Sequence, residues 1–104
     1  MLAEAIGILS KWGLGFDRSY KILGISNQSE SMCQECAEKA YVLTQIDKVL
    51  NQLFDNPENA NAFMSLQNHN GFFTGHTPIG IIEKGNIIDV QEVYTRINAI
   101  MSPW

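Results

Sequence analysis

The sequence contains no long apolar run. Its longest apolar stretch lies near residues 79–82, far short of the roughly 20 residues that a membrane-spanning helix needs. The first twelve residues include Glu4, no basic segment precedes their apolar part, and Trp12-Gly13-Leu14 is a poor cleavage site. These features are unlike a secretory signal. We therefore expect a cytoplasmic protein without a membrane span.

The sequence also lacks a surplus of basic residues. The formal net charge is −4. Acidic residues outnumber basic ones by five to four in residues 1–40, and by six to three in residues 41–104. Because phosphate binding depends on clustered Lys and Arg, we expect DNA binding to be weak. A basic protein surface is at least as plausible a partner.

Strand-like alternation of polar and apolar residues is missing as well. Apolar residues instead recur at intervals of three and four, which predicts an all-α fold. The helices are expected at about 2–12, 16–23 and 28–37, then from about 42 to 53, from Pro57, from Pro78 to Gly85, and from about 89 to 101. A boundary at 40/41 would separate a three-helix region (1–40) from a second helical domain (41–104).

Three local motifs mark the ends of the predicted helices. Gly24 lies where a left-handed residue ends a helix. Asn56-Pro57 and Thr77-Pro78 each combine a capping side chain with a proline at the first helical position. The predicted core of residues 41–104 includes Val49, Leu53, Phe63, Ile82, Val93 and Ile97.

Catalytic and metal-binding patterns are nearly absent. Cys33 and Cys36 form a CxxC pair, but a zinc site needs four ligands. The other candidates, His69 and His76, are seven residues apart in a loop rich in Gly and Asn. No strand precedes the pair as in a thioredoxin-like motif, and no phosphate loop or nucleophile elbow is present. We expect no enzyme activity, metal or cofactor, and two cysteines that pack on a short helix.

Residues 16–37 match the outline of a helix-turn-helix. Arg18 and Lys21 could contact phosphates in such a motif, and Asn27 and Gln28 could bind adenine edges. The second helix, however, carries no Arg or Lys. Its acidic residues would be repelled by phosphates: Glu30, Glu35 and Glu38. Two interpretations stay open, a DNA-binding motif and a helix pair used for packing or dimerisation, and the second is favoured.

Several motifs follow one another in a characteristic order. They are Lys11-Trp12-Gly13-Leu14, Ile22-Leu23-Gly24-Ile25-Ser26, the segment Leu53-Phe54-Asp55-Asn56-Pro57-Glu58-Asn59-Ala60, Gln67-Asn68, Phe73-Thr74-Gly75-His76-Thr77-Pro78, Lys84-Gly85, and an apolar helix from Val90 to Ile100. Their order and spacing resemble the Xre/MbcA/ParS-type antitoxins of bacterial toxin–antitoxin pairs. The resemblance is strongest from residue 41 onward.

The resemblance implies a function based on binding. It implies an Xre-like region in 1–40, a toxin-binding domain in 41–104, and a homodimer. The implied partner is a RES-domain toxin that degrades NAD and is silenced when the antitoxin covers its active site. Some family members bind their own operator, but the acidic helix after Ser26 departs from that pattern. The alternative function is a helix-turn-helix transcriptional regulator whose C-terminal half serves dimerisation.

The end of the sequence supplies a candidate toxin-binding site. The last apolar helix stops at Met101, and Pro103 then holds Trp104 beyond it. Aromatic anchors dominate interface energetics, and the resemblance implies that this region covers the toxin's NAD-binding cleft. We expect Trp104 and the terminal carboxylate to enter or rim the cleft, and Arg96 to pair with an acidic group on the toxin. The expected toxin-binding residues are Arg96, Ser102, Pro103 and Trp104. In the alternative, Trp104 folds back on its own helix or makes no contact.

Overall fold

The computed structural model describes residues 2–24, 34–66, 75–84 and 86–101. These residues form six helices and no strand, which confirms the predicted all-α fold. The helices are α1 (Leu2–Lys11), α2 (Phe16–Leu23), α3 (Gln34–Leu53), α4 (Pro57–Phe63), α5 (Pro78–Ile82) and α6 (Ile87–Met101).

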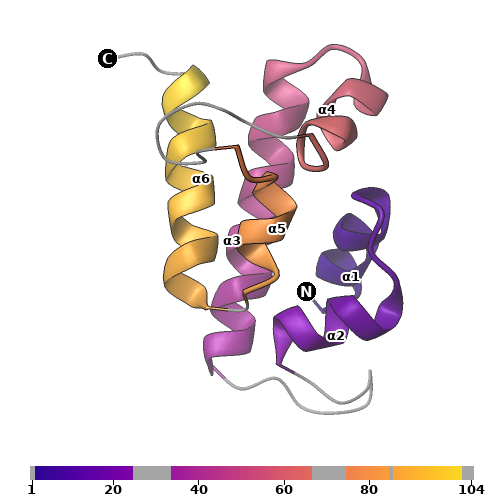
Figure 1. Cartoon of the computed structure of the whole chain (residues 1–104), viewed down its shortest axis with the longest axis vertical. Helices are drawn as coiled ribbons and strands as arrows, with labels where there is room; N and C mark the ends of the chain where they lie inside the picture. The colour runs from indigo at the N-terminus through magenta and orange to yellow at the C-terminus, as the bar shows by residue number, and fades with distance from the viewer. Residues whose placement is uncertain (1, 25–33, 67–74, 85, 102–104) are drawn as a thin grey trace.

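Helix α3 is the centre of the arrangement. It contacts α1, α2, α4 and α6, while α5 packs against α6. In Figure 1, α3 and α6 lie side by side and run in the same direction, with α1 and α2 on the opposite side of α3. One hydrophobic core joins all six helices. Its members include Leu9, Trp12, Leu23, Leu43, Ile46, Leu50, Ala60, Ile82, Val93 and Ile97.

The long helix α3 corrects one prediction. A helix ending near Ala37 and a separate helix beyond Tyr41 were expected, yet 34–53 is continuous. The segment from Ala37 to Tyr41 contains good helix formers and no Gly or Pro, so nothing in it ends a helix. The predicted boundary at 40/41 therefore falls inside α3. The predicted start of the earlier helix at residue 28 lies outside the described residues.

The turn after α2 is formed as predicted. Gly24 has a φ of 74°, in the left-handed region, and its backbone N–H donates to the carbonyls of Tyr20 and Lys21. The turn rests on α3, because the Sγ atom of buried Cys36 lies 3.9 Å from the Gly24 carbonyl oxygen. A Cβ atom added at Gly24 would lie 3.4 Å from that sulfur atom.

Both predicted capping motifs are confirmed. The Asn56 side chain accepts a hydrogen bond from the Glu58 N–H at 2.9 Å, and the Thr77 hydroxyl accepts one from the Gly80 N–H at 3.0 Å. Helix α6 begins two residues earlier than predicted, because Asn86 accepts from the Ile88 N–H at 2.8 Å and caps the helix there.

The predicted core of the second half is confirmed in its main members. The side chains of Val49, Ile82, Val93 and Ile97 are buried. Leu53 and Phe63 are partly buried and pack against the same core from its edge. Within the described ranges, no helix has both the length and the apolar character required to cross a bilayer.

Candidate functional site

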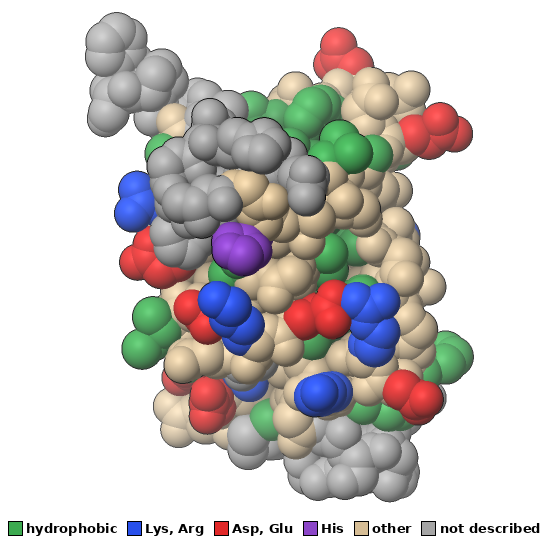
Figure 2. Space-filling model, viewed as in Figure 1, with side chains coloured by type: hydrophobic (Ala, Val, Ile, Leu, Met, Phe, Trp, Pro, Cys, Tyr) green, Lys and Arg blue, Asp and Glu red, His purple; other side chains and the backbone are tan. Residues whose placement is uncertain are grey.

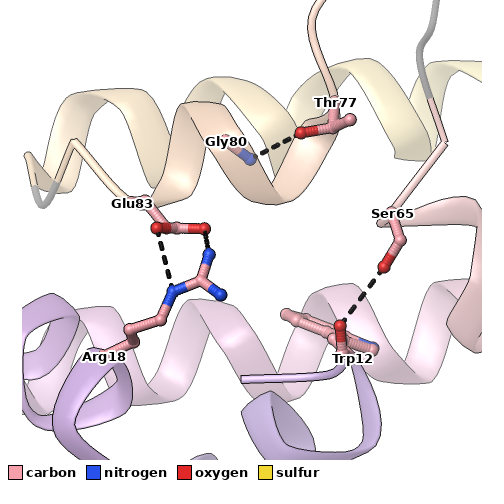
Figure 3. A network of polar contacts seen from close by, with 6 residues as sticks. All are labelled: Trp12, Arg18, Ser65, Thr77, Gly80 and Glu83. Carbon is pink, nitrogen blue, oxygen red and sulfur yellow. Dashed lines mark hydrogen bonds and ion pairs between the residues drawn. The ribbon is translucent and has the colours of Figure 1, made fainter. Parts of the chain in front are cut away.

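The first candidate site contains the predicted phosphate-binding residues, Arg18 and Lys21 on α2. The Arg18 guanidinium forms an ion pair with Glu83, which caps the C-terminal end of α5, and the Nε atom donates to Oε2 at 3.2 Å. Figure 3 shows the two groups facing each other across two hydrogen bonds. Because the Glu83 carboxylate already compensates the charge, a DNA phosphate would have to compete for Arg18.

Most other cations of residues 1–40 also make internal contacts. Lys11 on α1 lies 3.0 Å from the Asp47 carboxylate on α3. The buried Lys39 ammonium donates to the Ile22 carbonyl at the end of α2, at 3.3 Å. These contacts join α1 and α2 to α3. Lys21 is exposed. On the face shown in Figure 2, acidic and basic side chains lie close to one another.

The remaining predicted DNA-binding residues, Asn27 and Gln28, lie outside the described residues. The helix that was expected to carry them begins, in its described part, at Gln34 and continues as the central helix α3. Arg18 and Lys21 lie one turn apart on α2. Their distance from Asn27 and Gln28 stays a prediction.

The candidate toxin-binding residues belong to α6 and the segment after it. Arg96 is exposed on α6, and its Nε atom lies 3.6 Å from the Glu92 carboxylate one turn earlier. An exposed pair of this kind contributes only about 0.3–0.5 kcal/mol. Ser102, Pro103 and Trp104 lie outside the described residues.

The cysteine and histidine residues form no cluster in the described part of the chain. Cys36 is buried beneath the Gly24 turn, and His76 is exposed directly before α5. Cys33 and His69 lie outside the described residues. Among the residues that are described, no three His, Cys, Asp or Glu side chains are placed to hold a metal ion.

A groove between α3 and α6 is the feature that the sequence did not indicate. It has a volume of about 470 Å³ and is lined by Gln34, Ala37, Glu38, Tyr41, Val42 and Gln91. Tyr41, which lines the groove, is 54% exposed, and Ile88, one turn before Gln91 on α6, is 63% exposed. The sequence feature that corresponds to this groove is Tyr41, an aromatic residue at an exposed position of α3.

The residues that carry the family resemblance occupy junctions of the fold. Trp12 is 2% exposed, and its carbonyl oxygen accepts a hydrogen bond from the Ser65 hydroxyl at 3.3 Å (Figure 3). Gly24 ends α2, while Asn56 and Thr77 begin α4 and α5. These positions determine where helices begin, end and meet.

Comparisons of the chain with protein-family models, with curated proteins and with solved structures find no match. The resemblance to antitoxins therefore rests on the motifs of the sequence.

Proposed function

We propose that this chain is an antitoxin-like protein that binds a RES-type NAD-degrading toxin and covers its active site. The observation that carries the proposal is the placement of the motif residues. Trp12, Gly24, Asn56 and Thr77 each fix a helix end or a contact between helices. The resemblance thus concerns positions that determine where the helices of this fold begin, end and meet.

The distribution of charge favours a protein partner over DNA. A protein that binds DNA tightly releases counterions by placing several cations against phosphates. In residues 1–40, Lys11, Arg18 and Lys39 are each engaged with other parts of the chain. This observation weighs against the alternative function, a helix-turn-helix transcriptional regulator. Inhibition by covering a cleft requires no such cations and no catalytic groups.

The proposed toxin contact lies at the C-terminal end of α6. Arg96 would exchange its exposed pair with Glu92 for an acidic group on the toxin's rim. Ser102, Pro103 and Trp104 would follow into the cleft, with the Trp104 indole as the anchor. A buried indole contributes a large apolar contact area and commonly forms the energetic centre of an interface.

The function is tested by co-expression with a RES-domain toxin, taken from the neighbouring reading frame where that frame encodes one. We expect the full chain to restore growth and cellular NAD and to co-purify with the toxin at equal molar ratio. Ser10→Ala, at an exposed position of α1 outside the motifs of the resemblance, serves as a control that should still protect. Failure of the full chain to bind or silence the toxin would contradict the proposed function.

The location of the contact is tested separately by removing residues 102–104. The shortened chain should keep its circular dichroism spectrum and lose protection. If it still neutralises the toxin at equal molar ratio, the tail is not the inhibitory site, while the proposed function stands.

The rival function is tested by DNA binding of the isolated protein. We expect weak affinity for the DNA upstream of its gene, measured by fluorescence anisotropy at two salt concentrations. Tight binding that falls steeply with salt, and that is weakened in Arg18→Ala and Lys21→Ala, would favour the transcriptional regulator.

A further inference from the structure

The residues proposed above for the toxin contact are too few for a stable complex. They are Arg96, Ser102, Pro103 and Trp104. Each partner of a specific protein–protein complex commonly contributes about 20–30 residues and about 800 Å² of surface. A toxin that is held firmly by this chain must therefore cover further residues. Helix α3 lies beside α6 (Figure 1), so the surface that these two helices form adjoins the proposed contact.

The groove between α3 and α6 has the apolar character that this additional contact requires. It has a volume of about 470 Å³, and its apolar lining consists of Ala37, Tyr41 and Val42. Tyr41 is 54% exposed, and aromatic side chains at such positions commonly become anchors of an interface. The lining residue Gln91 precedes Arg96 by five residues, about 7.5 Å along α6. One partner surface can therefore cover both the groove and Arg96.

The charge of the groove favours a basic partner. Glu38 is its only charged lining residue, and no Lys or Arg lines it. The Glu38 carboxylate accepts a 3.4 Å hydrogen bond from the Gln34 amide, and the ion pairs among the described residues do not include it. Because the chain as a whole carries a net charge of −4, a basic surface is also the one that it attracts from a distance.

We propose that this groove is a second toxin contact, and that it binds a helix of the toxin on which an apolar side chain is flanked by Lys or Arg. The inference rests on the proposed function. The apolar side chain would pack against Tyr41 and Val42, and the cation would pair with Glu38. A groove between helices is a common binding site for an amphipathic helix. A Lys or Arg can bury its methylene stem against apolar lining while its charged group reaches a carboxylate.

The inference is tested by measuring the affinity of the purified full chain for the purified toxin by calorimetry. Glu38→Lys should weaken binding by about tenfold or more, because two cations would then face each other. Glu38→Gln removes the charge without adding a like one, so it should weaken binding less and reduce the dependence of the affinity on salt. Tyr41→Ala should weaken binding by about tenfold, because it removes the aromatic anchor.

Two variants away from the groove serve as matched controls. Glu4→Lys makes the same change of charge at an exposed position of α1, which lies on the opposite side of α3 from α6 (Figure 1). Phe16→Ala removes an aromatic ring that is 62% exposed on α2. Both should bind the toxin as tightly as the unchanged chain. The circular dichroism spectrum of each variant shows whether it is folded, and Glu38→Gln is the smaller change if Glu38→Lys alters the spectrum.

The outcomes separate this inference from the proposed function. If folded Glu38→Lys and Tyr41→Ala variants bind as tightly as the unchanged chain, or if the two controls weaken binding equally, the groove is not a contact and the proposed function stands. If the unchanged chain does not bind the toxin, the proposed function fails and this inference fails with it.

Discussion

Two isoleucines of α6 show how strongly the burial of a side chain determines its contribution to the stability of the fold. Ile97 is 0% exposed and packs in the core, whereas Ile88 is 63% exposed. Both belong to the same helix, so truncation to alanine removes the same atoms. Any difference in stability between the two variants therefore reports burial.

We expect Ile97→Ala to lower the free energy of unfolding by about 2–5 kcal/mol, because it removes buried methyl groups and leaves a cavity. Ile88→Ala should change it by less than about 0.5 kcal/mol, the usual range for exposed positions. Urea denaturation measures both values. Equal costs for the two variants would show that Ile97 does not lie in the core.

Residues differ in how far the sequence predicts their environment. Ile97 belongs to a regular apolar stripe, so its burial follows from helical periodicity. The pair of Arg18 with Glu83 joins residues 65 positions apart, and only the tertiary fold brings them together. Lys39 is buried although lysine rarely is, because the Ile22 carbonyl at the end of α2 accepts its hydrogen bond. The sequence contains no local signal for either contact.

At the scale of elements, the short helix α5 depends on its cap. The helix has five residues, so the bond from the Gly80 N–H to the Thr77 hydroxyl is a large share of its polar contacts (Figure 3). Gly80 itself leaves room for this contact, because a Cβ atom there would lie 2.8 Å from the Thr77 hydroxyl oxygen.

Removal of the cap should therefore destabilise the protein. Thr77→Ala is expected to cost about 1 kcal/mol, within the range of 0.5–2 kcal/mol for lost N-caps. Thr77→Ser keeps the hydroxyl acceptor and should cost much less. Both values come from denaturant unfolding. If serine and alanine are equally destabilising, the methyl group of Thr77 and not its hydroxyl group is what matters at this position.

Elements were predicted well where the sequence contains a stop or start signal. Gly24, Asn56-Pro57 and Thr77-Pro78 each correspond to a helix end in the structure. The prediction failed around residues 37–41, where no such signal exists. Two separate helices were expected there, yet α3 is continuous and contacts α1, α2, α4 and α6. One continuous helix can pack against different neighbours along its length.

At the scale of the molecule, α3 connects parts that the sequence suggested were separate. Its buried residues lie on both sides of the predicted boundary, with Cys36 and Ala40 before it and Leu43 and Ile46 after it. The salt bridge of Lys11 with Asp47 and the pair of Arg18 with Glu83 add polar links between residues 1–40 and the remainder. A cut at 40/41 would therefore divide both a helix and a core.

We expect a fragment of residues 41–104 to be poorly folded by itself. It loses the first seven residues of α3, and it exposes the apolar face of α3 that α1 and the buried Trp12 side chain cover in the full chain. Small domains have little stability to spare, so the loss of part of a single core commonly unfolds them. The full chain should unfold in one cooperative transition, whereas the fragment should show reduced helicity and a broad transition by circular dichroism.

A fragment of residues 34–104 is the matched comparison, because it keeps α3 whole but still lacks α1 and α2. It should be more helical than residues 41–104, yet less stable than the full chain, since the α3 face toward α1 stays exposed in both fragments. The two fragments thereby separate the effect of cutting the helix from that of removing its neighbours. If residues 41–104 unfold cooperatively with the stability of the full chain, the predicted boundary at 40/41 divides two domains that fold independently.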